Sequence, residues 1–578
     1  MRRTKPYILL ALVIGLLLAA TLLFRSQLQQ HNKINATLWA LVIHKDDFLK
    51  KQSAVSELAT FGSAAYPHIA RAFHPKYTFF DRAYDLAGRK LPKPLRTYFP
   101  ARPSRAELRR AVATSLYDLG PTASRALLNE IEIGLKDLNA YESATLLRAL
   151  YWSIPESPRA ALILSNYLAH PEPGKPLFGM TDALEIWPHV THLAPLLPPW
   201  LRQFTTSAEA AEALGLMGTN AAFALPLLVD IAKNRFISSP TVDSRHGQGS
   251  PSYIPDNRAA AIEALGNIGI GTPEVLEVLR QAFTDPSDRI RNEATLAFGT
   301  LGAKALPALD YFLANIDRKN PSVLQHQLHA LAQFGTNAAA AVPLLLELSQ
   351  DLALPILGNI NRLPSASPMG LHHIWIWRNE PKPGMTAAAL ALTQIDLHAA
   401  KDRIDVLALA LRYQVPTNVL RSLRVYKSEL IPKLDAHLHV GEPLGTLRPP
   451  FGPLGMPILR IILAHNILAL DSENQPARRL LQTAMTDTDP TMRALAANWF
   501  YKATGDTNQT LPIIAESLRH VKTGDDQALI RIVTDFGPHA KPLIPHLEPF
   551  LSHPDQFIRN LTGKALRSAN ARKACIET

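Results

Sequence analysis

The chain has 578 residues, with 47% hydrophobic, 7% aromatic and 19% charged side chains. Its length excludes one ordinary hydrophobic core and favours several domains or a repeat array. Its one cysteine, Cys575, excludes an intrachain disulfide and a cysteine-based metal site. The formal net charge of +11 lies in residues 1–103, which hold sixteen Lys and Arg against five Asp and Glu. The remaining residues carry 44 charges of each sign. We therefore expect no basic groove for nucleic acid.

The N-terminal segment 1–33 is predicted to be a basic flank and a transmembrane anchor, with the span at 7–24. The span has eighteen residues without a charge and follows three basic residues. As a helix it reaches roughly 27 Å, close to the hydrocarbon thickness of a bilayer. No A-x-A-like site is evident, which favours an uncleaved signal anchor. The basic flank predicts a single-pass membrane protein with a cytoplasmic N-terminus and an extracytoplasmic body.

A short phrase recurs along the rest of the chain, as in helical repeat arrays. Gly269, Gly302 and Gly335 stand 33 residues apart. The phrase consists of an apolar residue and Gly, then small residues, often with Pro and Leu. It begins at Phe61, Leu119, Met217, Leu301, Phe334 and Phe536.

Each unit is predicted to hold two short helices. Segments 257–269 and 289–302 fit the first helix, with apolar residues at i, i+3, i+4 and i+7. The glycine ends this helix, because a left-handed position costs it no Cβ clash, and the second helix follows. Small Ala residues allow adjacent helices to approach closely. The 46 prolines fit many short helices, because Pro is tolerated at first helical positions. Continuing the register predicts further helix ends near Ser153, Trp187, Asp396, Asp471, Gly505 and Ser568.

The glycine phrase and the Asp-Pro turns at Asp285-Pro286 and Asp489-Pro490 resemble HEAT repeats, of the short kind also seen in the phycobilin lyase family. The resemblance covers roughly residues 45–570, or about thirteen units, and fits worst in 397–456. It implies an all-α fold, an α-solenoid or right-handed superhelix of antiparallel HEAT-type helix pairs, which we divide into 34–355 and 356–578. It also implies an alternative function, an enzyme-associated protein of the class that attaches bilins to other proteins, but it fixes no catalytic residue.

Four insertions interrupt the 33-residue rhythm, near 74–103, 236–256, 352–383 and 441–456. Each is predicted to follow a second helix and to precede the next first helix. Because equivalent positions of a solenoid project from the same edge, the four loops are expected to line one functional edge.

The first insertion combines seven Lys and Arg with six Phe and Tyr, a mixture that suits an anionic surface or an acidic protein. The alternative is a solvated loop whose aromatic side chains cap the end of the solenoid. The candidate partner-binding residues here are Lys76, Tyr77, Phe79, Phe80, Arg82, Arg89, Lys90 and Arg96.

The third insertion holds a second group of candidates, His372, Trp375, Trp377 and Arg378. Trp and Arg are favoured anchors at interfaces, so these side chains are candidates for a binding platform. The alternative is that they pack back onto the adjacent repeat.

No motif for catalysis is present: the chain lacks a G-x-S-x-G elbow, a Walker loop, a Rossmann glycine set and an H-E-x-x-H motif. The His pairs 372/373 and 437/439 lack the spacing and the companions of a metal site. We therefore expect no catalytic residue, cofactor or metal. The predicted function is a membrane-tethered scaffold that binds a protein or an anionic envelope partner; a structural spacer of the cell envelope is the remaining alternative.

Overall fold

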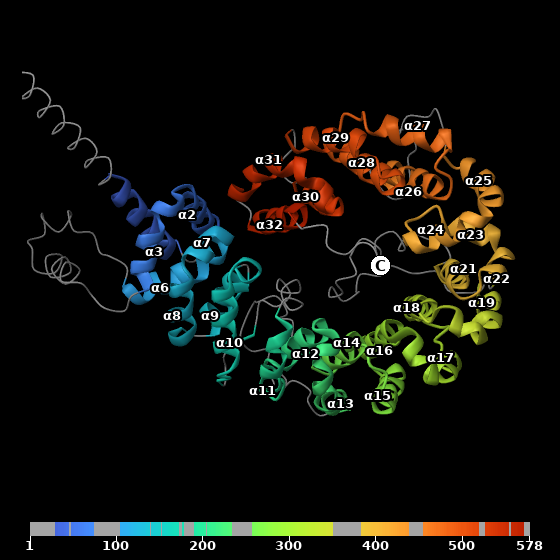
Figure 1. Ribbon diagram of the computed structural model, residues 1–578, viewed down its shortest axis with the longest axis horizontal. Coiled ribbons are helices and arrows are strands. Elements are labelled where there is room, and N and C mark those ends of the chain that lie inside the picture. Colours follow the sequence, from blue (N-terminus) through green and yellow to red (C-terminus); the bar gives the residue numbers. More distant parts are fainter. Residues whose placement is uncertain are drawn as a thin grey trace, which may run out of the picture. The chain divides into compact units, whose positions relative to one another are not determined.

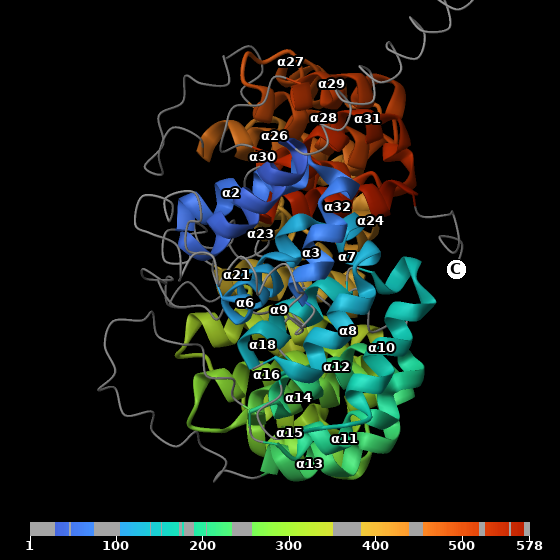
Figure 2. The same cartoon turned by 90° about the vertical axis from the view of Figure 1, so that its left-hand side faces the viewer.

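The computed structural model describes residues 29–44, 48–73, 104–138, 140–151, 153–172, 176–177, 190–203, 205–233, 257–350, 383–438, 455–519, 526–553 and 556–570. Throughout these ranges the chain forms helices and their connections, and no strand occurs in them (Figures 1 and 2). The prediction of an all-α fold is confirmed for this part of the chain.

The chain divides into two compact units. Unit 1 comprises residues 1–186 and 549–563, and unit 2 comprises residues 187–548 and 564–578. The boundary predicted at 355–356 lies outside the described residues and stays a prediction.

Unit 1 is a stack of short helices in which α3 packs on α6 and α8, and α6 packs on α9. A capping box starts α6: Ser104 Oγ accepts a hydrogen bond from the Glu107 N–H at 3.2 Å, and the Glu107 carboxylate accepts one from the Ser104 N–H at 3.0 Å. The helices are residues 29–43, α2 (Phe48–Thr60), α3 (Tyr66–Phe73), α6 (Arg105–Ser115), α7 (Pro121–Ala126), α8 (Leu128–Asp137), α9 (Ala140–Tyr151) and α10 (Pro158–Leu168).

Unit 2 begins with η6 (Thr191–Leu196) and α11 (Pro198–Leu201) and continues as two rows of helices. The first helices form one row, in which α12, α14, α16, α18 and α21 pack on one another in sequence, as do α24, α26, α28 and α30. In Figure 1 this row lies on the inner side of unit 2. Its members are α12 (Ser207–Leu216), α14 (Asn257–Ile268), α16 (Asp288–Leu301), α18 (Pro321–Ala332), α21 (Pro383–Ile395), α24 (Thr417–Leu423), α26 (Gly455–Leu470), α28 (Pro490–Thr504) and α30 (Asp526–Asp535).

The second helices form the outer row of unit 2 (Figure 1). They pack on the first helices of their own or a neighbouring repeat, as α13 does on α14, α15 on α16 and α27 on α28. They are α13 (Leu225–Lys233), α15 (Pro273–Phe283), α17 (Leu309–Ala314), α19 (Val342–Leu348), α22 (Leu397–Lys401), α23 (Ile404–Ala410), α25 (Lys427–Asp435), α27 (Gln475–Ala484), α29 (Thr507–Arg519) and α31 (Ile544–Leu547), and α32 (Gln556–Asn570) follows. The two rows confirm the prediction of a solenoid-like stack of helix pairs.

The turn glycines lie where the sequence predicts them. All six phrase glycines have positive φ, which spares them the Cβ clash that other residues would meet. They are Gly62 (53°), Gly120 (90°), Gly218 (60°), Gly302 (52°), Gly335 (63°) and Gly537 (51°). In five repeats the glycine opens a 3-10 helix rather than the second α-helix itself. These are η1 (Gly62–Ala64), η7 (Gly218–Ala224), η8 (Gly302–Ala308), η9 (Gly335–Ala341) and η11 (Gly537–Leu543).

A ladder of phenylalanines fills the space between the two rows. Phe283 and Phe312 of the outer row have ring centroids 4.6 Å apart, and Phe298 of the inner row lies 5.7 Å from each of them. Phe334 continues the ladder 5.8 Å from Phe312. All four are buried, so the core runs along the stack as the repeat pattern requires.

The same type of hydrogen bond occurs in the turns before two of the first helices. Arg291 Nη1 donates to the backbone oxygen of Asp285 at 2.7 Å, and Arg493 Nη1 donates to that of Asp487 at 2.8 Å. Asp487 is therefore the counterpart of Asp285. Asp489, from the second Asp-Pro pair, instead caps α28.

Most of the predicted helix ends are confirmed. Helices end at Ile395, Leu470 and Thr504, one residue before the predicted positions, and α9 ends two residues before Ser153. The helix α32 ends at Asn570, two residues after the end predicted near Ser568. Position 187 lies outside the described residues.

The predicted single-pass membrane location requires correction. In the part of the chain that the structure describes, no helix is long and apolar enough to cross a bilayer. Even the sixteen residues of the apolar helix α26 reach only about 24 Å, short of the ~30 Å hydrocarbon core. The span predicted at 7–24 lies outside the described residues. The prediction of a membrane location is contradicted and is withdrawn.

Candidate functional site

The first helices place one side chain per repeat at an equivalent position on the inner row. Glu212, Glu263, Leu296 and His329 each lie six positions before the positive-φ glycine of their own repeat. None of the four is buried, although the helices around them bury most of their other side chains. This position therefore faces away from the second helices.

Three further side chains lie one helical turn before this position, and Arg289 lies one turn earlier still. Together they form what we call the inner strip: Glu209 and Glu212 of α12, Glu263 of α14, Arg289, Glu293 and Leu296 of α16, and His326 and His329 of α18. The strip carries four carboxyl groups and one guanidinium group, so it is acidic.

A contact farther along unit 2 shows that equivalent positions of adjacent repeats meet. Trp499 lies six positions before Gly505, and His465 lies six before Asp471, the residue that follows α26. The two rings have centroids 4.7 Å apart, and Nδ1–H of His465 donates to the Trp499 carbonyl at 3.0 Å. Side chains at this position thus contact one another along the row.

The charge of Glu263 likewise acts on Glu212 across two adjacent first helices. Burial, together with the charges of Glu263 and Glu209 and against the charge of Arg289, raises the pKa of Glu212 to about 7. Burial also raises the pKa of Glu263, against the effect of Arg289 and a hydrogen bond from Asn267. Near neutral pH Glu212 therefore retains its proton about half of the time.

Glu209 is the most buried member of the strip, with 7% of its surface exposed. Its Oε2 atom is buried and has no hydrogen-bond partner among the described residues. Burial raises the pKa of Glu209, and its charge acts on Glu212, which places the two carboxyl groups close together. A buried carboxyl oxygen without a donor is costly, so a ligand that donates a hydrogen bond would be stabilised here.

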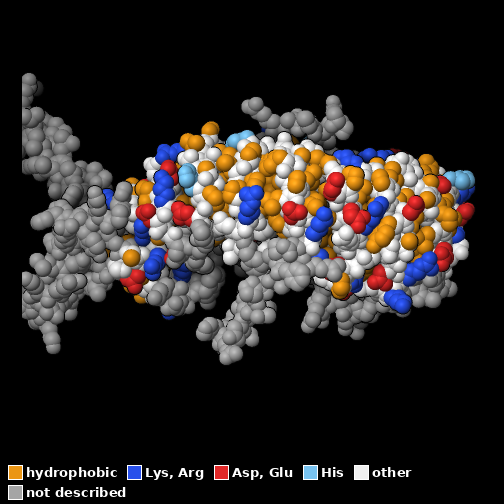
Figure 3. Space-filling view, turned by 90° about the horizontal axis from the view of Figure 1, so that it is seen from below, with side chains coloured by type: hydrophobic (Ala, Val, Ile, Leu, Met, Phe, Trp, Pro, Cys, Tyr) orange, Lys and Arg blue, Asp and Glu red, His pale blue; other side chains and the backbone are white. Residues whose placement is uncertain are grey.

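On the outer row, carboxylates form ion pairs with basic side chains. Arg318 Nη1 lies 2.7 Å from Glu347 Oε1, and Lys433 Nζ lies 2.6 Å from Asp405 Oδ1. Figure 3, seen from the side of α13, α15 and α17, shows acidic and basic side chains interspersed over the described surface. Pairs of a carboxylate with a basic side chain are thus present on the outer row.

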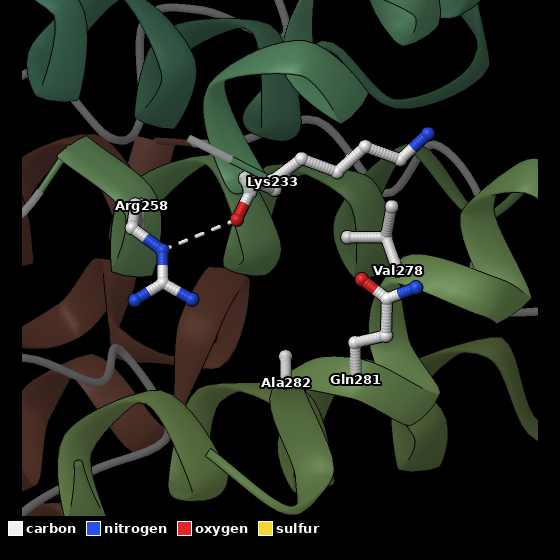
Figure 4. A pocket seen from close by; sticks show the side chains of 6 residues that line it. Lys233, Arg258, Val278, Gln281 and Ala282 are labelled. Carbon is white, nitrogen blue, oxygen red and sulfur yellow. Dashed lines mark hydrogen bonds between the residues drawn. The ribbon is translucent and has the colours of Figure 1, made fainter. Parts of the chain in front are cut away.

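A pocket lies between α13, α14 and α15 (Figure 4). Its cationic side chains are Lys233 and Arg258, and Val278 and Gln281 lie opposite them. Arg258 Nε donates to the backbone oxygen of Ala232 at 3.2 Å, and Arg258 also pairs with Asp285 at 2.9 Å. These bonds tie α14 to its neighbours, so we assign Arg258 a structural role.

The candidate residues of the two insertions lie outside the described residues. This holds for Lys76, Tyr77, Phe79, Phe80, Arg82, Arg89, Lys90, Arg96, His372, Trp375, Trp377 and Arg378. Their role in binding stays a prediction.

The ends of the flanking helices do show where the insertions leave the stack. The four connections run from α3 to α6, from α13 to α14, from α19 to α21 and from α25 to α26. In unit 2 each of the three runs from an outer helix to the next inner helix, as the sequence predicts.

Sequence reasoning missed the inner strip, although a signal for it exists. The glutamates at 212 and 263 stand in the related phrases AAEALG and AIEALG, directly before the turn glycine phrase. Aligning the repeats on the glycine and reading backwards would have found them. The carboxyl pair that the sequence does offer by proximity, Glu130 and Glu132, is solvated, and Glu132 pairs with Lys136 at 3.1 Å.

No group of three or more His, Cys, Asp or Glu in the described ranges has the geometry to hold a metal ion. The carboxyl groups of the inner strip can accept charge-assisted hydrogen bonds from ammonium and guanidinium groups.

The fold and the strip define a class, the helical-repeat proteins that present a row of equivalent side chains along a stack. Residues 252–315, which include α14, α15, α16 and α17, match the family model described as HEAT repeats. The resemblance to HEAT repeats is thus confirmed for this segment of the chain.

Several solved structures match most of this chain at low sequence identity. A crystal structure of an engineered protein has 12% identity and a TM-score of 0.24, covering 85% of this chain and 98% of that one. The karyopherin Kap121p bound to the extreme C-terminus of the protein phosphatase Cdc14p has 13% identity and a TM-score of 0.36, covering 94% and 67%. A homology model of the full-length AP-3 complex has 12% identity and a TM-score of 0.31, covering 93% and 94%. A comparison with curated proteins gives no match.

Proposed function

We propose that the chain is a non-catalytic HEAT-repeat scaffold that binds a protein partner along the inner strip. The observation that carries the proposal is the pair of carboxyl groups at equivalent positions of the adjacent first helices α12 and α14, Glu212 and Glu263, with the buried Glu209 beside them. A stack of repeats offers a long surface with one contact site per repeat, which suits an extended polypeptide.

A purely structural spacer is less well supported. A spacer requires only packing between repeats, and the glycines and phenylalanines of the core supply it. Burying Glu209 and crowding it against Glu212 costs stability and adds nothing to packing. Side chains that cost stability are typical of binding sites.

The enzyme class implied by the resemblance to phycobilin lyases receives no support from the strip. The charged groups that act on Glu212 are Glu263, Glu209 and Arg289. These carboxyl groups can accept hydrogen bonds from a cation or an amide, and the resemblance fixes no catalytic residue among them.

A site-specific crosslinker tests the proposal. A photo-reactive amino acid at Leu296, in the middle of the strip, is expected to capture a partner, with the crosslinked segment identified by mass spectrometry. The matched control places the same amino acid at Phe223, an apolar residue of η7 that is 48% exposed. Capture of the same proteins at both positions, or of none at Leu296, would contradict the proposal.

A further inference from the structure

The inner strip also indicates the chemistry of its partner, an inference that rests on the proposed function. We infer that the strip between α12 and α16 binds lysine or arginine side chains from an extended segment of the partner. The charge of the strip, its unused hydrogen-bonding capacity and the geometry of the row each favour a basic ligand.

The first step is the excess of negative charge. Among the described residues, Arg289 is the cation whose charge acts on Glu212 and on Glu263, and Glu209 adds a third carboxyl group. Elsewhere in unit 2 the chain places a basic residue beside a carboxylate, as Lys401 beside Glu429 at 3.4 Å and Lys427 beside Asp471 at 3.1 Å. The charge missing from the strip is the charge that a partner would supply.

The second step is the hydrogen-bonding capacity of Glu209. A buried Oε2 without a donor accepts from an N–H group, and an ammonium or guanidinium group offers both that donor and a positive charge. An acidic or apolar side chain would leave the oxygen unsatisfied. The site therefore discriminates between basic partners and the others.

The third step is the spacing of the row. Gly215 of α12 faces Ala264 of α14 so closely that a Cβ on Gly215 would come to 3.0 Å from Ala264 Cα. At such close approach of neighbouring helices, the carboxyl groups of adjacent repeats act together on one ligand. This explains why Glu212 is affected by Glu263 across the two helices as well as by Glu209 on its own helix.

The test uses the full chain and two synthetic peptides of equal length, one alternating Lys and Ser and one alternating Gln and Ser. Titration calorimetry measures their affinity for three proteins: the wild type, the double variant Glu212→Gln/Glu263→Gln, and the control Glu274→Gln/Glu277→Gln. The control removes the same charge from two exposed residues of α15 on the outer row. Circular dichroism checks that each variant folds.

We expect the Lys peptide to bind the wild type and the control equally, and the inner-strip variant about tenfold more weakly or worse. The Gln peptide should bind none of them. Equal weakening in both variants, or no weakening in either, would overturn the inference, because binding would then depend on overall charge or on another surface.

A second measurement needs no variant. Because a bound cation stabilises the ionised form of Glu212, binding at pH 7 should release protons, and the apparent enthalpy should then change with the ionisation enthalpy of the buffer. An enthalpy that is independent of the buffer would count against the inference. If the crosslinker at Leu296 captures a partner through a segment without Lys or Arg, the proposed function stands and this inference fails.

Discussion

Gly266 of α14 lies against Ala297 of α16 so closely that a Cβ on Gly266 would come to 2.5 Å from Ala297 Cα and 2.7 Å from its Cβ. Gly215 and Gly299 occupy the same position in their repeats, three residues before the turn glycine, and each faces an alanine of the next first helix at 3.0 Å. Backbone contact therefore fixes the spacing of the inner row, and with it the distance between the carboxyl groups of adjacent repeats.

The first prediction concerns this contact. Gly266→Ala should destabilise the protein by about 1–3 kcal/mol, because the added methyl group overlaps backbone atoms that cannot rotate away. Helix propensity alone predicts that the substitution stabilises the protein, since Ala is more favourable than Gly by about 0.5–1 kcal/mol within a helix. The midpoint of chemical unfolding decides between the two.

Thr300→Ala on the neighbouring helix is the control for Gly266→Ala. Thr300 is exposed, so its replacement should change stability by less than about 0.5 kcal/mol. A Gly266→Ala protein that is as stable as the wild type would show that the helices separate easily and that the spacing of the row is soft.

The repeat architecture could be predicted because its signals are local. A glycine with positive φ is needed at the end of each first helix, so the phrase around Gly218, Gly302 and Gly335 identifies the turns directly. The segment 397–456 fitted the repeat worst. There the structure places α22, α23 and α24, helices of five to seven residues, and no positive-φ glycine occurs among the described residues of this segment.

The candidate site could not be predicted in the same way. Glu212 and Glu263 are 51 positions apart in sequence, and each alone looks like an ordinary surface residue of a helix. Their closeness depends on the packing of α12 against α14 across an insertion, which a pattern within one repeat does not contain. The insertions are conspicuous in the sequence, whereas the regular part of each repeat is not.

The second prediction concerns the ion pair between Arg258 and Asp285. The two side chains are 16% and 5% exposed, and their charged atoms lie 2.9 Å apart. Asp285→Ala should cost about 3 kcal/mol, because it leaves a largely buried guanidinium without its carboxylate. Thermal unfolding measures the loss.

Asp288→Ala serves as the comparison for Asp285→Ala. Asp288 pairs with Arg291, but its side chain is 69% exposed, so its removal should change stability by less than about 1 kcal/mol. Equal effects of the two substitutions would show that burial does not set the strength of these pairs.

The third prediction concerns pH and His465. Burial lowers the pKa of His465 to about 4, with the charge of Lys502 adding to the shift and the hydrogen bond to Trp499 opposing it. In the unfolded chain a histidine titrates near 6.5, so the unfolded state binds more protons between about pH 4 and 6.5. Stability contributed by the neutral ring is complete above pH 6.5 and is lost as the pH falls towards 4.

His465→Gln should remove this part of the pH dependence. Denaturant titrations at pH 7.5 and pH 4.5 should differ by less in the variant than in the wild type, by up to about 3 kcal/mol. An identical difference in the two proteins would show that other groups, such as His68, whose pKa is also lowered to about 4, carry the acid sensitivity.

The fourth prediction links the stability of the protein to its proposed function. The pKa of Glu212 is raised to about 7, whereas an unfolded glutamate titrates near 4.3. Between these pH values the folded state binds more protons, so stability falls as the pH rises through this window and stays lower above it. Glu212→Gln removes the ionisation and should stabilise the protein at pH 8 by about 1–2 kcal/mol, while leaving it nearly unchanged at pH 4.

The control for Glu212→Gln is Glu274→Gln on the exposed side of α15, which should change stability little at either pH. If Glu212→Gln is more stable at pH 8 and binds the Lys peptide more weakly, the carboxyl group of Glu212 destabilises the free protein and stabilises the complex with the peptide. A variant that loses stability at pH 8 would instead mean that Glu212 is held by a favourable partner within the folded chain. The inner strip would then be a structural network, and a basic partner would have no unbalanced charge to neutralise.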